Sequence, residues 1–427
     1  MLLVRRREQA TGDAMTANDS FFQQKQAAAV LKHGILSRYV HVFASMTGVG
    51  SREGRVWFVD GYAGPGRYEP EDGAAFGAPG SPLLAIKTAA DLSVKSSARD
   101  LRCIFIEVDE TYANDLRAVL EAEAPHGVHY QVIQGEVETH LRSALALVAS
   151  DPLLVFLDPF GTSLPFELLC EILRSRASGE ITEVLLNFNL LAVSRIGGLL
   201  EGEDGRCGRG TSDATLARVD QFLGGAWWRD VFRAAREGDA PGEASRAAAA
   251  VADEFRKRVL ASTGYLSMPV PIRRRPNHRP LFLLTLFYRH EAAPYQFAEA
   301  ASGANEEWRR FNRALDLEED VERNLDTLFD RALCTELSER EAAEAEAALE
   351  AQWIEIIESN IRELLTEHDE VPVASEVLNI FGRTLALARE KHLRKAWDNL
   401  TAAGLVEPRQ PSIRMRNLSI RRAPATP

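Results

Sequence analysis

The fold of this chain is indicated first by the stretch Val56-Trp57-Phe58-Val59-Asp60-Gly61-Tyr62-Ala63-Gly64-Pro65-Gly66. Its first four residues are apolar, as in a buried strand, and a carboxylate and a glycine-containing loop follow them. Glycine lets the backbone turn sharply and approach a ligand, because no Cβ stands in the way. The stretch predicts a strand that leads into a ligand-binding loop, and a tight turn without a ligand is the alternative.

Four similar apolar runs follow, each ending in polar residues or glycine. They are residues 103–106 before Glu107, 130–133 before Gly135-Glu136, 153–157 before Asp158-Pro159-Phe160-Gly161, and 184–188 before Asn189. Helical stretches at residues 82–92, 111–122, 137–149 and 165–175 alternate with them, and residues 281–287 predict another strand. This alternation predicts the α/β class, a doubly wound, Rossmann-like sheet that binds ligands beyond the carboxyl ends of its strands.

Length and composition limit the class of protein. The 427 residues, 45% of them hydrophobic and 26% charged, suggest two or three ordinary globular domains. A net charge of -12 disfavours a wholly basic nucleic-acid coat or a polycationic membrane binder. The four cysteines form no Cys-x-x-Cys pair, so neither a zinc ribbon nor a disulfide framework is predicted. No secretory signal or membrane-length apolar run is apparent, and a cytoplasmic location is expected.

Composition also divides the chain into parts. Residues 1–19 are expected to form a disordered tail, and residues 20–300 the Rossmann-like domain, with a helical insertion around 200–262. Residues 301–350 are rich in Glu, Ala and Arg and predict a helical connector. Residues 351–427 predict a winged helix-turn-helix domain, with helices at 354–365, 376–380 and 384–403 and a hairpin of 405–407 with 413–420.

The strand-end residues predict a cofactor site. A carboxylate there can accept both hydroxyls of a ribose, a role assigned to Glu107, with Asp109 as substitute and a solvated acid as the alternative. The sequence has neither a phosphate-cradling loop nor the dinucleotide fingerprint leading directly into a helix. The pattern instead fits S-adenosylmethionine, and residues 67–80 resemble an insertion that folds over it. The predicted cofactor-binding residues are Asp60, Gly61, Tyr62, Ala63, Gly64, Gly66, Glu107 and Glu136.

The motif after the fourth strand predicts a substrate-facing group. Asp158, Pro159 and Phe160 resemble the Asp-Pro-Pro-aromatic motif of enzymes that methylate exocyclic amines of bases, although only one proline is present. In such a site the acid and a following carbonyl accept hydrogen bonds from the amine, and the ring stacks on a flipped base. A simple strand-end turn stays open. So does a metal-binding cluster of Asp60, Glu107 and Asp158, which would indicate a metal-dependent nuclease.

Taken together, these motifs resemble the three-Cys-motif partner proteins, a family similar to S-adenosylmethionine-dependent methyltransferases. The matching pieces span roughly residues 25–300 and are Lys32-His33 to Tyr39, residues 58–68, Gly80-Ser81-Pro82, residues 105–107, residues 156–161 and Leu186-Asn187-Phe188. The resemblance implies the fold and the cofactor. It also implies a radical-type partner protein that carries the three cysteines, and a non-catalytic nucleotide-sensing or scaffold role beside such a partner is an alternative to catalysis.

Basic residues near the end of the chain predict nucleic-acid binding, with DNA ahead of RNA. Residues 381–427 contain 10 Lys and Arg against 3 Asp and Glu, a local balance of +7. The predicted contacts are Lys391, Arg394 and Lys395 on a helix and Arg414 and Arg416 on the wing. Three other groups have structural interpretations that compete with binding: the helix-surface pair Lys32-His33, Arg195 at a helix end, and Trp227-Trp228, for which burial is favoured over a stacking role.

Overall fold

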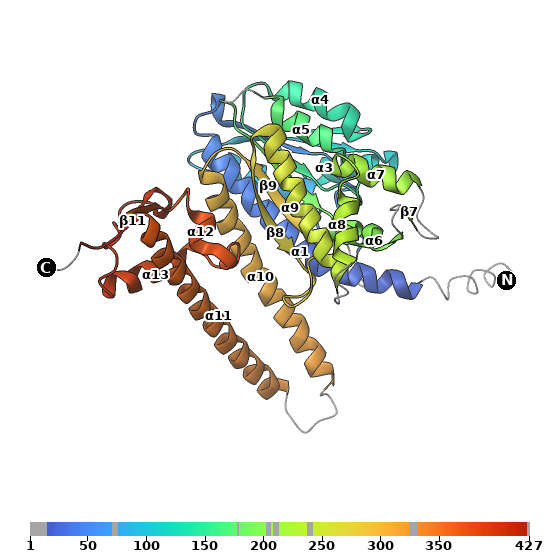
Figure 1. Ribbon diagram of the computed structural model, residues 1–427. Helices are drawn as coiled ribbons and strands as arrows, with labels where there is room; N and C mark the ends of the chain where they lie inside the picture. The colour runs from blue at the N-terminus through green and yellow to red at the C-terminus, as the bar shows by residue number, and fades with distance from the viewer. Residues whose placement is uncertain are drawn as a thin grey trace.

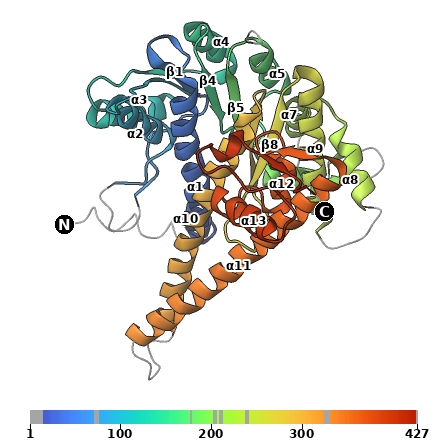
Figure 2. The ribbon, with the colours of Figure 1, turned by 90° about the vertical axis from the view of Figure 1, so that its left-hand side faces the viewer.

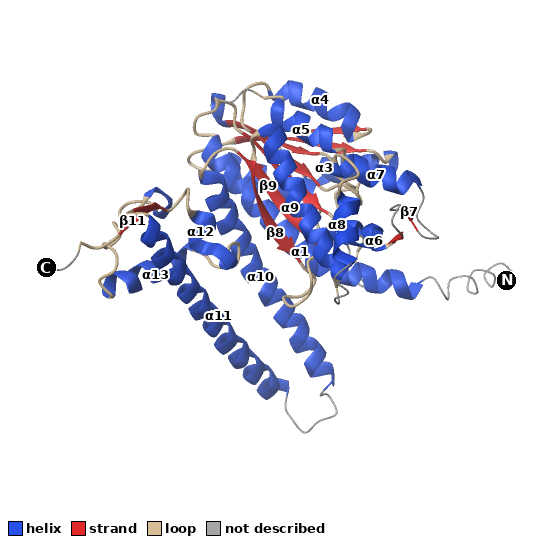
Figure 3. Ribbon diagram, in the orientation of Figure 1, coloured by secondary structure: helices blue, strands red, loops and turns tan. Residues whose placement is uncertain are grey.

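The computed structural model describes residues 15–70, 76–176, 179–201, 206–207, 213–236, 242–323 and 331–424. Its centre is a seven-stranded sheet in the order β3-β2-β1-β4-β5-β9-β8 (Figures 1 and 3). Strands β1 to β5 are parallel, and β9 lies antiparallel between β5 and β8. The bounds are β1 (Arg55–Asp60), β2 (Asp100–Glu107), β3 (Tyr130–Gln134), β4 (Leu153–Leu157), β5 (Thr182–Phe188), β8 (Leu266–Ile272) and β9 (Phe282–Tyr288). The predicted α/β class with a mostly parallel sheet is confirmed.

The apolar runs form strands because both faces of the sheet are covered. Every residue of β4 and β5 is buried, as expected for central strands of a parallel sheet. Strand β8 was not predicted from the sequence, since it contains Pro269 and Pro271. Proline has no N–H to donate to a neighbouring strand, and β8 accommodates it because this strand is at the edge of the sheet.

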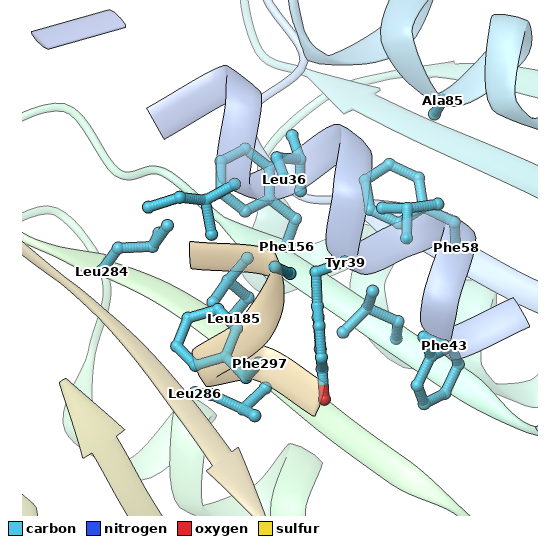
Figure 4. Close-up of a cluster of buried hydrophobic side chains, with 14 of the residues drawn as sticks. Leu36, Tyr39, Phe43, Phe58, Ala85, Phe156, Leu185, Leu284, Leu286 and Phe297 are labelled. Atoms are coloured by element: carbon cyan, nitrogen blue, oxygen red, sulfur yellow. The ribbon is translucent and has the colours of Figure 1, made fainter. Parts of the chain in front are cut away.

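Helices pack on both faces. One face is covered by α1 (Met15–Thr47), α2 (Ser81–Ser93), α3 (Glu110–Glu123) and α10 (Ala292–Arg323). Figure 4 shows Tyr39 of α1 and Phe297 of α10 among Phe156, Leu185 and Leu286 of the sheet. The other face carries α4 (Val137–Val148), α5 (Phe166–Arg174), α6 (Leu190–Gly198), α7 (Asp213–Leu223), α8 (Trp228–Arg236) and α9 (Glu243–Thr263). Two short strands, β6 (Leu200–Glu201) and β7 (Arg206–Cys207), pair with each other.

The first helix extends further than its apolar spacing suggested. The helix α1 begins at Met15, and the disordered tail over residues 1–19 stays a prediction. Residues 1–14 lie outside the described chain.

Two long helices contain the predicted connector. Residues 301–323 continue α10, which starts on the sheet, and residues 331–350 begin α11 (Arg331–Glu367). Arg309 and Arg313 of α10 both donate to Glu346 of α11 at 2.7 Å. Figures 1 and 2 show this pair of helices extending beyond the sheet domain.

The C-terminal part has a hydrophobic cluster of its own, around Trp353, Leu393 and Trp397. It consists of the end of α11, β10 (Glu370–Pro372), α12 (Val377–Phe381), α13 (Glu390–Ala402) and β11 (Ser419–Arg421), with 3-10 turns at Gly382–Thr384 and Met415–Asn417. A further 3-10 turn, Arg52–Gly54, precedes β1. This part packs on α10, where Tyr295 donates to Glu390 at 2.6 Å and Asn305 donates to the Ala386 carbonyl at 2.9 Å.

Two predicted details of this part are wrong. The helix predicted over 384–403 begins only at Glu390, because Ala386 has a φ of 62° and the backbone turns there. The predicted hairpin is reduced to one bridge between Val406 and Arg422, and β11 pairs instead with β10, antiparallel. The winged-helix assignment stays a prediction. None of the helices in the described chain is long and apolar enough to span a membrane.

Candidate functional site

Four polar side chains meet at one edge and on one face of the sheet. Asp60 is opposite Phe105 of β2 and Phe156 of β4, and Leu157 of β4 is opposite Leu186 of β5. Side chains two residues apart on a strand share a face, so Asp60, Glu107, Asp158 and Asn187 all point to the α1 side. They follow or end the strands at the carboxyl edge, where the sequence predicted a ligand site.

Glu107 holds the glycine loop. Its Oε2 accepts a hydrogen bond from the Gly64 amide at 2.7 Å and its Oε1 accepts one from the Asp109 amide at 2.9 Å. Gly64 has a φ of 65°, and a Cβ built on it would meet nothing within 4 Å. The loop therefore leaves open space beside its backbone, and the carboxylate still has lone pairs for a ligand hydroxyl. Asp109, the substitute, instead caps α3 by accepting from the Tyr112 amide at 3.0 Å.

Asp60 is a fully buried acid with an unfilled hydrogen-bonding position. Its Oδ1 accepts from the Tyr62 amide at 3.1 Å, and its Oδ2 has no partner of regular hydrogen-bond geometry within the described chain, although the Ser81 side chain lies close enough to favour the charged carboxylate. Burial raises the pKa of the Asp60 carboxyl to about 7. A buried acceptor without a partner is costly unless a ligand supplies a donor. Asp60 is thus a candidate for binding a donor group, such as an amine.

Asp158 is bound from two sides by other residues of the chain. Lys32 of α1 forms an ion pair with its Oδ2, and the Asn187 amide donates to its Oδ1 at 2.7 Å. The side chains of Lys32 and Asp158 are only 13% and 26% exposed. The interpretation of Lys32 as part of a helix-surface pair is therefore wrong: α1 covers the sheet and turns Lys32 toward the strand ends.

The charges in this pair support each other. Burial alone would lower the pKa of Lys32, but the adjacent Asp158 raises it above its ordinary value. Burial alone would raise the pKa of Asp158, but Lys32, assisted by Asn187, lowers it. Both groups are therefore charged at neutral pH, and an ammonium is held inside the site.

His33 and Tyr68 lie beside this pair. The Tyr68 hydroxyl is 3.3 Å from Nε2 of His33. Burial, and next the charge of Lys32, lower the pKa of His33 to about 3. His33 is consequently neutral at physiological pH and adds no second positive charge next to Lys32.

The predicted aromatic residue of the motif is exposed. The Phe160 side chain is 92% exposed, while the preceding Pro159 is buried. A ring two residues after Asp158 is suited to stacking on a planar group. Glu136, predicted to be near the adenine, is also exposed, immediately before α4 at the end of β3.

The insertion after the glycine loop folds back on itself. Arg67 pairs with Pro79 in an antiparallel bridge, and the Tyr68 amide donates to the Ala78 carbonyl at 2.9 Å. Arg67 also forms an ion pair with Glu123 of α3, which fastens the insertion to the sheet domain. Phe76 at its far end is 75% exposed, a second accessible ring that the sequence did not single out.

The alternative of a metal-binding cluster is not supported by the arrangement of the described side chains. Within the described ranges no three His, Cys, Asp or Glu side chains are grouped so as to hold a metal ion. Asp158, which that alternative required, is instead bound by the ammonium of Lys32. A cation there would have to displace a charge already in place.

The predicted nucleic-acid contacts differ in their surroundings. Lys391 forms an ion pair with Glu350, Arg394 with Glu390, and Arg416 donates to the sulfur of Met46 at 3.2 Å. Lys395 and Arg414 are exposed and make no ion pair with any described residue. Counted over the whole predicted domain, residues 351–427 contain 11 Lys and Arg against 10 Asp and Glu. Only part of the expected basic surface is therefore free.

The remaining candidates are structural or peripheral. Trp228 is fully buried and its ring N–H donates to Asp220 at 2.8 Å, so the predicted burial is confirmed for it. The Arg258 guanidinium lies 4.4 Å from the ring centroid of Trp227. Arg195 is exposed on α6.

Comparison with known proteins adds no family. No protein-family model matches this chain, and no curated protein sequence matches it either. The resemblance to the three-Cys-motif partner proteins therefore stays a prediction from sequence motifs. Sequence reasoning missed Asn187 as a partner of Asp158 and Phe76 as an exposed ring, and for Lys32 it favoured a surface position over a contact with the site. A signal was present for Asn187, a lone amide in an apolar strand.

Proposed function

We propose that this chain is an S-adenosylmethionine-dependent methyltransferase-like protein that acts on nucleic acid. The observation that carries the proposal is the strand-edge site, in which Glu107 holds the glycine loop at Gly64 and Asp60 keeps an unpartnered buried oxygen. These features suit a ligand with a ribose and an amine. Bound S-adenosylmethionine would supply an electrophilic methyl group on a sulfonium.

The order of the sheet supports this proposal by analogy. The commonest dinucleotide-binding sheet runs 3-2-1-4-5-6. Here the last strand of the chain's sheet, β9, is inserted antiparallel between β5 and β8. Strands β1 to β5 therefore follow the nucleotide-binding order, and only the antiparallel pair β8 and β9 departs from it. Fold analogy supports the cofactor class and does not identify a substrate.

Each site residue has a proposed role toward the cofactor or the acceptor. The open backbone at Gly64, with Gly61, Ala63 and Gly66 around it, would receive the amino-acid part of the cofactor, and Asp60 would accept from its amine. Glu107 would bind the ribose hydroxyls, and Glu136 would contact the adenine. Asp158 and Phe160 would face the acceptor. The sequence motif favours an exocyclic amine of a base as that acceptor, and the Lys32 contact of Asp158 bears directly on this prediction.

Isothermal titration with S-adenosylhomocysteine tests the cofactor assignment. Glu107→Gln and Asp60→Asn should each weaken binding by about tenfold or more, since each loses a hydrogen bond to a polar ligand group. Glu110→Gln is the matched control, because this exposed acid of α3 is three residues from Glu107 and outside the site. No heat and no thermal shift at millimolar ligand, with folded protein, would remove the proposal.

A non-catalytic role is the second candidate, favoured by one observation. The charge of Asp158 is already balanced by Lys32, and Asn187 donates to its other oxygen, so this carboxylate is less able to stabilise the positive charge that builds on an attacking amine. Transfer of a labelled methyl group to mixed DNA, RNA and protein distinguishes the two roles. Transfer lost in Asp158→Asn supports catalysis, whereas cofactor binding without transfer supports a nucleotide-sensing or scaffold protein beside a radical-type enzyme.

Nucleic-acid binding by the C-terminal part, as a winged helix-turn-helix, belongs to the same proposal. Lys395 and Arg414 support it, because their charges are exposed and not paired with described acids. Phosphate contacts release counterions, so binding of the full chain to duplex oligonucleotides should weaken steeply with salt. Fluorescence anisotropy should show a shallower salt slope for Lys395→Ala and Arg414→Ala than for Lys391→Ala, whose charge Glu350 already neutralises.

A further inference from the structure

Lys32 places a positive charge where the acceptor group would bind. Its ammonium contacts Asp158 Oδ2, Asp158 follows β4 at the carboxyl edge, and Phe160 is two residues further along. An ammonium has three N–H donors, and Asp158 is the one acceptor recorded for Lys32 among the described residues. The Lys32 side chain is 13% exposed, and it has N–H groups beyond the one that Asp158 accepts, next to the carboxylate of Asp158.

The sign of this charge separates two kinds of acceptor. When a neutral amine attacks a methyl group, positive charge builds on its nitrogen, and a nearby ammonium opposes that change. When a hydroxyl attacks, the oxygen loses its proton and carries developing negative charge, and an ammonium stabilises it. Asp158 cannot compensate fully for an amine, because its charge is already balanced by Lys32 and its second oxygen is bound by Asn187.

We infer that the acceptor of this site is a hydroxyl oxygen, with Lys32 as the residue that binds it and Asp158 as the residue that positions Lys32; this inference rests on the proposed methyltransferase function. In an unmodified polynucleotide the free hydroxyl along the chain is the ribose 2′-hydroxyl. The substrate class is therefore RNA. The exposed ring of Phe160 suits an unstacked base next to the modified ribose.

The reaction balances with groups already named. The oxygen forms a bond to the methyl carbon, the carbon–sulfur bond of the sulfonium breaks, and its electron pair stays on sulfur as a thioether. The hydroxyl proton leaves to solvent water, which reaches the site beside the partly exposed Asp158. Lys32 keeps its proton throughout and serves only as hydrogen-bond donor and charge.

The test uses the full chain with a labelled methyl donor and three oligonucleotides of one sequence: RNA, DNA, and RNA whose riboses are replaced by 2′-deoxyriboses one position at a time. Products are digested to nucleosides and analysed by mass spectrometry, which separates a methyl group on ribose from one on a base. We expect ribose methylation of RNA, no transfer to DNA, and loss of transfer at the deoxy-substituted position. Methylation of a base nitrogen would overturn the inference and leave the proposed function standing.

Variants of Lys32 separate its role from a structural one. Lys32→Met should lower transfer by about 100-fold or more, the loss typical for removing one donor to a developing oxyanion. Lys32→Arg, which keeps a cation, should restore a measurable part of it. Affinity for S-adenosylhomocysteine should change less than threefold in both. Lys87→Met, at an exposed lysine of α2, is the control and should be unchanged.

Two further outcomes would overturn the inference. If Lys32→Met transfers methyl groups at the wild-type rate, Lys32 does not bind the acceptor. If the wild-type chain binds the cofactor and transfers no methyl group to any of the three oligonucleotides, catalysis on nucleic acid and the inference built on it are both wrong. If the chain does not bind the cofactor at all, the proposed function itself is wrong.

Discussion

Replacing Lys32 with methionine should destabilise the protein in a pH-dependent way. The substitution keeps most of the apolar stem of the side chain and removes the ammonium that pairs with Asp158. Asp158 would then be an unpaired charge, held by Asn187 alone at 2.7 Å. The cost should therefore come from Asp158, not from lost packing of Lys32.

The magnitude follows from how far the pair is buried. Breaking a fully buried ion pair costs about 3–5 kcal/mol, and breaking an exposed one about 0–1 kcal/mol. With side-chain exposures of 13% and 26%, the Lys32–Asp158 pair lies between these cases, nearer to the buried one. We expect a loss of about 2–3 kcal/mol at pH 7, or roughly 2–3 °C in Tm for a chain of this length. The double variant Lys32→Met/Asp158→Asn should recover most of it, since no charge remains unpaired.

The pH dependence gives the sharper test. In the wild type the pKa of Asp158 is lowered, so the pair stabilises the fold above the unfolded value of about 3.9 and loses this effect as the pH falls. Without Lys32, burial raises the pKa of Asp158, and protonation at acid pH relieves the penalty. Urea unfolding should thus show a large gap between wild type and Lys32→Met at pH 7 and a small one near pH 4. An equal gap at both pH values, with no rescue by Asp158→Asn, would refute the reasoning.

Three other substitutions have definite outcomes. The pKa of Asp60 is raised to about 7, so the wild type should lose stability as the pH rises from about 4 to 7, by up to about 1.4 kcal/mol per pH unit. Asp60→Asn should remove this pH dependence, and urea unfolding across that range checks it. Gly64→Ala should cost about 1–2 kcal/mol through its φ of 65°, without a clash, whereas Gly50→Ala, also free of contacts, should be neutral in the same assay. Phe160→Ala should leave Tm unchanged and weaken binding of single-stranded RNA by about 1–3 kcal/mol. Val94→Ala, at a similarly exposed position away from the site, should change neither quantity. A lower Tm in Phe160→Ala would mean that the ring packs on the protein.

The sheet was predictable because its strands are buried on both faces. A run such as β4, in which all five residues are buried, can only be apolar, and its length separates it from a helix. The edge strand β8 was not predictable on the same grounds, because edge positions admit Pro269 and Pro271. The late start of α13 depends on the φ of Ala386, and alanine gives no signal for a left-handed conformation.

The candidate site was predictable only in the part that the strands carry. Strand ends of a parallel sheet meet by topology, so Asp60, Glu107 and Asp158 could be placed at one edge from sequence alone. Lys32 is on a helix, and its position depends on how α1 crosses the sheet, which periodicity does not specify. Its contact with Asp158, 126 residues further along the chain, follows from packing and has no local signature.

The exposed positive charge at the C-terminal end of the chain also could not be predicted from the sequence count alone. The +7 balance of residues 381–427 predicted a basic surface, but the helix before it, α11, supplies acids that the count omitted. Glu350 of α11 pairs with Lys391, and Glu299 and Glu306 of α10 pair with Arg389. Residues 301–350 alone contain 15 Asp and Glu against 6 Lys and Arg, so most of the net charge of -12 lies on these two long helices. An RNA or DNA backbone would be repelled along α10 and α11. Among the described residues of the C-terminal part, Arg383, Lys395 and Arg414 are exposed and make no ion pair, so phosphate binding should be sought at these residues and not along the basic helix as a whole.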